Sequence, residues 1–178
     1  MTLKIHLHGS NHSGKTCLLL RYTTNEFPQE YVPPCLKPAE AEVKVDEQLT
    51  SVSLYDCPIG SVDYINLRLA NIGNIDLFVA CFAVNSESQR ADILDRWLPE
   101  MREHCPEAKV LLVGTKIDLR SSQECMSYKD GVKFGKEIGA VGYMECSALT
   151  GEGVAQVVES AVRCATASPE QDNGCVLS

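Results

Sequence analysis

A glycine-rich loop near the amino terminus places the strongest constraint on what this chain can fold into. Residues 9–16 read Gly-Ser-Asn-His-Ser-Gly-Lys-Thr and fit the pattern G-x-x-x-x-G-K-[ST] in full. Residues 3–8 alternate between apolar and polar side chains, which predicts a strand, and residues 15–24 predict a helix. A loop between a strand and a helix can aim its backbone N–H groups at one phosphate, and the helix amino terminus adds a favourable dipole. The sequence therefore predicts a polyphosphate site at this loop.

Within this site, we expect Lys15 to reach the outer phosphates and the Thr16 hydroxyl to bind Mg²⁺. Asp56, which ends the strand 49–55, is predicted to support the Mg²⁺ ion from outside its directly bound ligands, with a strand-end cap as the alternative role. The predicted phosphate-binding residues are Asn11, His12, Ser13, Gly14, Lys15, Thr16 and Cys17.

The remaining pattern predicts an α/β fold. Residues 77–84 and 110–114 are uninterrupted apolar runs, typical of parallel strands that are covered on both faces. Residues 39–45 and 49–55 alternate with period two around a polar turn, which predicts a hairpin, and a short strand is predicted at 142–145. We expect a mostly parallel six-stranded sheet with one antiparallel edge strand and helices on both faces. Two apolar stripes at helical spacing support the helices: Ile93, Leu94, Trp97, Leu98 and Met101, and Val154, Val157, Val158, Ala161 and Val162.

Length and charge bound the organisation of the chain. A length of 178 residues fits one domain, which we place at residues 1–167, and the polar residues 168–178 predict a flexible tail. A net charge of −8 disfavours binding to nucleic acid or to an anionic membrane by charge alone, so we expect no nucleic-acid partner.

The nine cysteines include no C-x-x-C pair and no zinc-ligand spacing. The amino terminus lacks the pattern of a signal peptide, and no apolar run reaches the ~20 residues of a membrane span. We therefore expect a cytoplasmic protein whose cysteines are reduced and mostly buried.

Two segments indicate which base the site accepts. The segment 115–118, Thr-Lys-Ile-Asp, follows the predicted strand 110–114, and its carboxylate can accept hydrogen bonds from N1–H and the exocyclic amine of guanine. Adenine does not offer these two donors in that arrangement. The segment 147–149 follows the strand 142–145, and its backbone N–H groups can meet the guanine carbonyl. The predicted base-binding residues are Thr115, Lys116, Asp118, Ser147, Ala148 and Leu149.

With these motifs in place, the chain resembles a small GTPase of the Ras superfamily and, within it, the Rho family. The resemblance covers nearly the whole chain and implies a P-loop G domain that switches between GDP and GTP, with Mg²⁺ as cofactor. It implies effector and regulator proteins that contact the switch regions of a monomer, and it implies that Phe27 lies across the guanine near Lys116. The segments that carry it are residues 15–19, 22–25, 27–28, 114–120, 136–141 and 145–150.

The phosphate loop departs from the family pattern in its interior. The family has glycine where Asn11 stands and usually a small residue where His12 stands. A side chain at Asn11 would crowd the γ-phosphate and the space that an arginine finger enters. We interpret His12 as an exposed loop residue, with a phosphate contact or pH sensing as the alternative. The segment 120–128 is too short for the helical insert of Rho proteins, which is a Ras-like feature.

Both switch segments depart as well. The family reads Tyr-x-Pro-Thr where residues 31–34 read Tyr-Val-Pro-Pro, and Pro34 has neither the hydroxyl for Mg²⁺ nor the N–H for the γ-phosphate. The family reads Asp-x-x-Gly-Gln where residues 56–61 read Asp-Cys-Pro-Ile-Gly-Ser. A one-residue insertion aligns Gly60 with the glycine and Ser61 with the catalytic glutamine, whereas an ungapped reading puts Gly60 at the glutamine. The glutamine is absent either way, and the predicted catalytic residues are Lys15, Gly60 and Ser61.

The last four residues, Cys-Val-Leu-Ser, fit the C-a-a-X pattern of a farnesylated terminus. We expect a prenyl group on Cys175 to hold the protein at the cytoplasmic face of a membrane, weakly, because no polybasic run precedes it.

These features together predict a Rho-like guanine-nucleotide switch that hydrolyses GTP slowly. The alternative is a nucleotide-loaded interaction module, nearly inactive as an enzyme and regulated by abundance, localisation or modification. An ATP-using P-loop enzyme is disfavoured by the segment 115–118.

Overall fold

A six-stranded sheet lies at the centre of the structure, a computed structural model that describes residues 2–33, 37–57 and 75–167. The strand order is β2-β3-β1-β4-β5-β6, and among the described strands only β2 and β3 pair antiparallel. This topology confirms the predicted mostly parallel sheet with one antiparallel edge strand. The strands are β1 (Leu3–His8), β2 (Ala39–Val45), β3 (Gln48–Asp56), β4 (Leu77–Ala83), β5 (Lys109–Thr115) and β6 (Gly142–Glu145).

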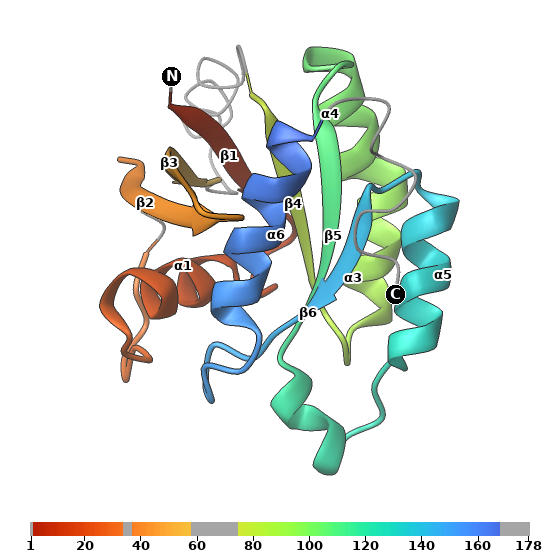
Figure 1. Cartoon of the computed structure of the whole chain (residues 1–178). Coiled ribbons are helices and arrows are strands. Elements are labelled where there is room, and N and C mark those ends of the chain that lie inside the picture. Colours follow the sequence, from red (N-terminus) through yellow and green to blue (C-terminus); the bar gives the residue numbers. More distant parts are fainter. Residues whose placement is uncertain (1, 34–36, 58–74, 168–178) are drawn as a thin grey trace.

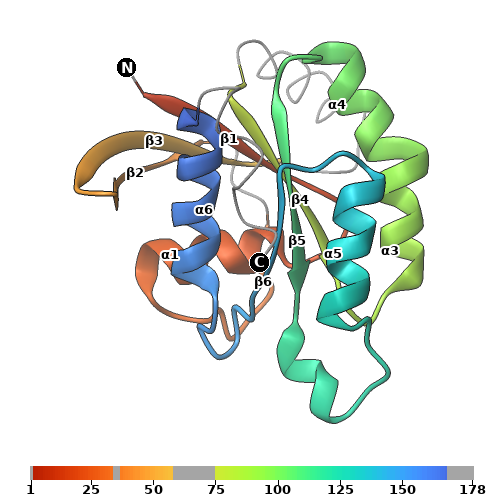
Figure 2. The ribbon, with the colours of Figure 1, turned by 45° about the vertical axis from the view of Figure 1, so that its right-hand side comes forward.

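Helices cover both faces of the sheet, as the sequence predicts (Figure 1). One face carries α1 (Lys15–Thr24) and α6 (Val154–Thr166). Figure 2 shows the sheet between these helices and a second group on the other face. That second group consists of α3 (Glu87–Asp92), the π-helical turn Ile93–Trp97, α4 (Leu98–His104) and α5 (Tyr128–Glu137).

The apolar run of β4 divides its side chains between two cores. Leu77, Val79 and Cys81 pack in the core beneath α1 and α6, and the residues between them pack beneath α4 and α5. Side chains alternate in direction along a strand, so a strand covered on both faces needs apolar residues at every position. All seven residues of β4 are buried, which explains why its sequence shows no alternation.

Two helices differ from what apolar spacing predicts. Leu94 is 47% exposed, so the stripe on the first helical segment lacks this residue: Ile93, Trp97 and Met101 are buried, and Leu98 packs against the same core. Residue 94 lies about 100° around the helix from residue 93 and faces solvent. The apolar spacing of the sequence predicts no stripe for helix α5. The reason is that two of its three buried residues are the glycines Gly131 and Gly135.

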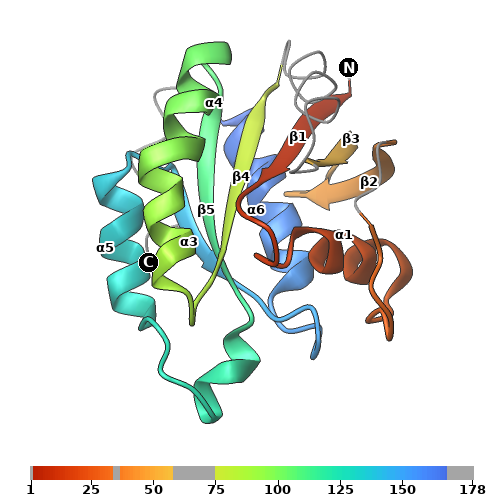
Figure 3. The same ribbon diagram turned by 180° about the vertical axis from the view of Figure 1, so that it is seen from behind.

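The carboxyl ends of the parallel strands gather the predicted site residues at one edge. Figure 3 shows β1 leading through a short loop into α1 at this edge. Asp56 ends β3, Thr115 ends β5, and Ser147 follows β6 by two residues. In the described chain, residues 122–127 link the 3₁₀ turn Ile117–Ser121 to α5 without a helix, in agreement with the short segment read from the sequence.

Several predicted features lie outside the described residues: Pro34 in switch I, Gly60 and Ser61 in switch II, and residues 168–178 with Cys175. Across residues 2–33, 37–57 and 75–167, no helix has both the length and the apolar character to cross a membrane.

Candidate nucleotide-binding site

The loop between β1 and α1 has the backbone conformation that its motif requires. Gly9, His12 and Gly14 have φ angles of 137°, 61° and 89°. These angles fall in the left-handed region, which glycine adopts without steric cost. A Cβ atom at Gly9 would lie 2.1 Å from the carbonyl oxygen of Cys81 on β4, so only glycine fits there. His12 adopts this conformation as a non-glycine residue, and it is exposed.

Lys15 is enclosed by this loop. Its Nζ atom donates hydrogen bonds to the carbonyl oxygens of Gly9 (2.8 Å) and Ser10 (2.9 Å) and to the hydroxyl of Ser13 (3.3 Å). Burial lowers the pKa of Lys15, while neighbouring acidic groups, Asp56 among them, raise it. The loop thus holds one ammonium group in the position where a phosphate-binding lysine is needed.

Thr16 and Asp56 meet beside Lys15. The Thr16 hydroxyl donates a hydrogen bond of 2.5 Å to Oδ2 of Asp56. Oδ1 of this buried carboxylate has no hydrogen-bond partner among the described residues. Burial raises the pKa of Asp56, whereas the Thr16 hydroxyl and Lys15 lower it. A buried carboxylate oxygen without a partner is costly, and a hard divalent cation beside the Thr16 hydroxyl would satisfy it.

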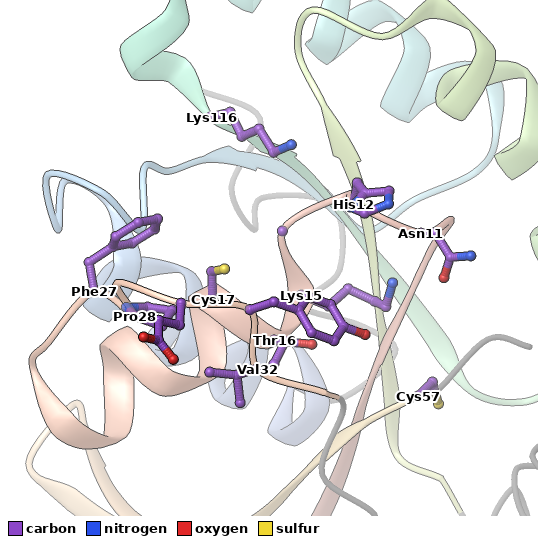
Figure 4. A pocket seen from close by; sticks show the side chains of 13 residues that line it. Asn11, His12, Lys15, Thr16, Cys17, Phe27, Pro28, Val32, Cys57 and Lys116 are labelled. Atoms are coloured by element: carbon purple, nitrogen blue, oxygen red, sulfur yellow. The ribbon is translucent and has the colours of Figure 1, made fainter.

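Lys15 and Thr16 line an open pocket with a volume of about 450 Å³. In Figure 4, Asn11 and His12 lie on one side of this pocket, and Phe27 and Pro28 lie on the other. Polar groups of the loop and apolar groups of residues 27–32 both contribute to its walls. The pocket therefore combines phosphate donors with surfaces that can cover the rest of a nucleotide.

A second, mostly apolar pocket of about 140 Å³ adjoins the first. Gly14, Cys17, Phe27 and Lys116 line both pockets, so the two form one continuous cleft. Phe27 and Lys116 thus both line this cleft. The other residues of the second pocket are Leu18, Thr115, Asp118, Leu119, Cys146, Ala148 and Leu149. Apolar walls with a carboxylate at one end suit a flat base that carries paired N–H donors.

The carboxylate of Asp118 is held by a serine from the next strand connection. The Ser147 hydroxyl donates a hydrogen bond of 2.5 Å to Oδ1 of Asp118 and accepts one from the backbone N–H of Thr150. Within the described chain, Ser13 and Ser147 are fully buried and line neither pocket. Their hydroxyl groups stabilise the conformation of the site through hydrogen bonds with Lys15, Asp118 and Thr150. Thr115 does the same, because its hydroxyl donates to the carbonyl oxygen of Ser13 over 2.6 Å.

Comparison with known proteins agrees with this geometry. The sequence model described as "Ras family" matches residues 4–167, a range that includes all of the sheet except its first residue, Leu3, together with the loop and both pockets. The chain belongs to the Ras family. Ras-family domains bind guanine nucleotide with Mg²⁺ and hydrolyse GTP, so this protein is a GTP-binding small GTPase.

The residues of this Ras-family domain fit the ligands of the family. Lys15 and the loop N–H groups can bind and orient the phosphates, and the walls around Phe27 can exclude water from the base. Thr16 and Asp56 would hold Mg²⁺, which, when bound, neutralises negative charge on the outer phosphates.

One set of contacts that brace the loop is not predicted by the sequence. The Ser10 hydroxyl donates to Oδ2 of Asp92 (2.5 Å) and accepts from Nε1 of Trp97 (3.0 Å). The Gln89 amide donates to the backbone carbonyl of Asn11 (3.2 Å). These bonds tie the loop to α3 and the π turn. The partners lie 78 to 87 residues apart, so no local spacing could reveal them.

A second unpredicted set braces the turn that carries Asp118. The Arg120 guanidinium donates two hydrogen bonds, of 2.5 and 2.6 Å, to the Glu145 carboxylate at the end of β6. The Tyr143 hydroxyl donates to the same carboxylate over 2.7 Å. The hydrogen bond with Glu145 raises the pKa of Arg120 above its ordinary value. The base-binding turn is thereby fastened to β6, two residues before Ser147.

Proposed function

We propose that this protein is a Rho-like switch GTPase that holds guanine nucleotide and hydrolyses GTP slowly. The observation that carries the proposal is the sequence Asp-Cys-Pro-Ile-Gly-Ser at residues 56–61, which contains no glutamine. In Ras-family catalysis a glutamine orients the attacking water, and an arginine finger stabilises the developing charge. A serine hydroxyl at residue 61 is too short to take over the first role.

The phosphate loop supports the same proposal. Asn11 and His12 line the phosphate pocket at positions where the Rho family has glycine and a small residue. Side chains there occupy space that an arginine finger needs near the γ-phosphate. Fast hydrolysis assisted by a regulator is therefore disfavoured along with fast intrinsic hydrolysis.

The sequence of switch I supports the proposal that the protein binds GTP and GDP with similar affinity. Pro34 stands at the family position that contacts the γ-phosphate and Mg²⁺, and proline offers no N–H and no hydroxyl. The two nucleotides should therefore bind with more similar affinity than in other members of the family. This property also favours the second candidate, a nucleotide-loaded interaction module whose activity follows its abundance, location or modification.

We further propose that Cys175 carries a prenyl group that directs the protein to the cytoplasmic face of a membrane. The terminal Cys-Val-Leu-Ser supports this proposal, and the absence of an upstream polybasic run implies weak, reversible binding. Incorporation of a farnesyl group that is lost in Cys175→Ser is the expected result. Equal membrane recovery of the two proteins would contradict it.

The hydrolysis proposal is best tested by a gain of function. Single-turnover hydrolysis of bound GTP should run at or below the ~10⁻⁴ s⁻¹ scale of unassisted Ras. Ser61→Gln should accelerate it, and Ser61→Ala, which changes the same position without supplying a carboxamide, should not. Wild-type turnover well above that scale would show that Ser61 or His12 replaces the glutamine.

The switch proposal is tested by calorimetry of GTP and GDP binding. The wild-type protein should bind the two with similar affinity, and Pro34→Thr should increase the preference for GTP. A strong GTP preference in the wild type would contradict the role assigned to Pro34.

A further inference from the structure

Three side chains of metal-binding type meet outside the groups that are assigned to the nucleotide. His6 and His8 lie on the same face of β1, because residues two apart in a strand share a face. Cys57 directly follows β3, the parallel neighbour of β1, and its backbone N–H donates to the carbonyl oxygen of Leu7 over 3.2 Å. The register of the two strands thus brings Cys57 beside the two histidines.

The ligand atoms are close enough to share one ion. One ring nitrogen of each histidine and Sγ of Cys57 all lie within 4.8 Å of one another, and Nδ1 of His6 lies 3.4 Å from Sγ. In a tetrahedral zinc site, bonds of about 2.0 Å to nitrogen and 2.3 Å to sulfur put the ligand atoms roughly 3.3–3.6 Å apart. Nδ1 of His6 and Sγ already have this separation, and the ligand nitrogen of His8 lies within 4.8 Å of both.

The chemistry of the three groups selects the ion. Two imidazoles and a thiolate suit Zn²⁺ and other borderline or soft metals, and they are poor ligands for Mg²⁺. Metal binding requires neutral imidazoles and a deprotonated thiol. This donor set therefore differs in kind from the oxygen ligands Thr16 and Asp56.

The surroundings hold both imidazole rings in place. His6 stacks on Tyr55 with ring centroids 4.4 Å apart, and His8 meets the ring of Phe78 edge-on at 5.1 Å. His8 also lies 5.9 Å from the ring of Trp97. All three ligand residues are buried, with exposed fractions of 1%, 1% and 4% for His6, His8 and Cys57. Such apolar walls exclude competing water and strengthen metal–ligand bonds.

We propose that His6, His8 and Cys57 form a site for one Zn²⁺ ion. Binding replaces the thiol proton of Cys57 by the metal and releases that proton to solvent, while the two imidazoles bind as neutral ligands. Cys57 also lines the phosphate pocket and appears at its edge in Figure 4, which provides a path for the ion from the nucleotide cleft. This site does not depend on the proposed rate of hydrolysis.

Co²⁺ binding to the full chain in its GDP-bound form, in excess Mg²⁺, tests the site. Co²⁺ bound by the Cys57 thiolate should give a thiolate-to-cobalt charge-transfer band. Co²⁺ in the Mg²⁺ site would give no such band, because that site offers only oxygen ligands. Cys57→Ser should abolish the band, and His6→Asn or His8→Asn should weaken Zn²⁺ binding at least tenfold. Cys125→Ser and His104→Gln, which change a cysteine and a histidine elsewhere, should leave both unchanged.

A band that persists in Cys57→Ser, or Zn²⁺ affinity that is unchanged in both histidine variants, would overturn the proposal. If these buried substitutions prevent folding, zinc X-ray absorption of the wild-type protein decides the question. One sulfur and two imidazole ligands are expected. A zinc coordination shell without sulfur, or with more than one sulfur, would refute the site. Recovery of less than stoichiometric zinc with the purified protein would refute it as well.

Discussion

Replacing Gly131 by alanine tests the packing that supports the base-binding turn. A Cβ atom at Gly131 in α5 would lie 2.1 Å from Cζ of Tyr143 and 2.5 Å from its hydroxyl oxygen. Tyr143 is fully buried, and its hydroxyl donates to the Glu145 carboxylate that holds Arg120. The ring therefore has no room to retreat without disturbing this network.

Two opposing effects set the size of the change. Alanine is better than glycine inside a helix by about 1 kcal/mol, whereas forcing an extra carbon into a packed core costs about 1–3 kcal/mol. The contact at Gly131 is more than 1 Å shorter than the ordinary Cβ contact of about 3.4 Å, so the cost should fall in the upper part of that range. We expect a net loss of about 1–2 kcal/mol in the free energy of unfolding, or roughly 2–8 °C in Tm.

Gly135 in the same helix provides the matched control. A Cβ there would lie 3.6 Å from its nearest neighbour, Cβ of Tyr143, which is ordinary contact. Gly135→Ala should therefore keep the helix gain and stabilise the protein by up to about 1 kcal/mol. Urea unfolding at fixed GDP and Mg²⁺ measures both variants on one scale, since bound ligand shifts the midpoint. A Gly131→Ala protein as stable as Gly135→Ala would refute the reasoning.

Three further predictions follow from the site and the core. Asp118→Asn should shift base preference from guanine toward xanthine, because an amide offers a donor where the carboxylate accepts; unchanged guanine selectivity in competition binding would contradict the assignment of the base. Ser147→Ala should weaken GDP binding by about 1 kcal/mol, roughly fivefold, since the hydroxyl that fixes Asp118 is lost; calorimetry that shows no change would remove Ser147 from the site. Burial raises the pKa of the Cys81 thiol from 9.0 to about 12. The unfolded thiol thus ionises first, and its contribution to stability is present below about pH 9 and lost as the pH rises toward 12. Between about pH 9 and pH 11, the free energy of unfolding measured in urea should fall less in Cys81→Ala than in the wild type. An equal fall in the two proteins would contradict the raised pKa of Cys81.

Much of the fold can be predicted from the sequence because apolar runs and the glycine loop carry local signals. The run 77–83 is apolar throughout since β4 is covered on both faces, and the loop at 9–16 requires glycine where Gly9 meets Cys81. The segments 115–118 and 147–149 lie at strand ends, so a parallel sheet brings them together.

Features that depend on distant packing leave no such signal. Helix α5 buries glycines against Tyr143, so its buried face shows no apolar stripe. The alternation in β1 gives no indication that His6 and His8 are buried, or that Cys57, 51 residues after His6, completes their cluster. The cysteine spacing predicts no zinc site, because the proposed ligands His6 and Cys57 lie 51 residues apart in the sequence.

The nucleotide bound to the purified protein, followed over time, tests the central claim most directly. Guanine nucleotide should be recovered at one equivalent per chain, because both pockets and the family match indicate it. The proposed slow hydrolysis predicts that preloaded GTP survives for hours at the ~10⁻⁴ s⁻¹ scale or below. Conversion to GDP within minutes, or recovery of adenine nucleotide, would contradict the account.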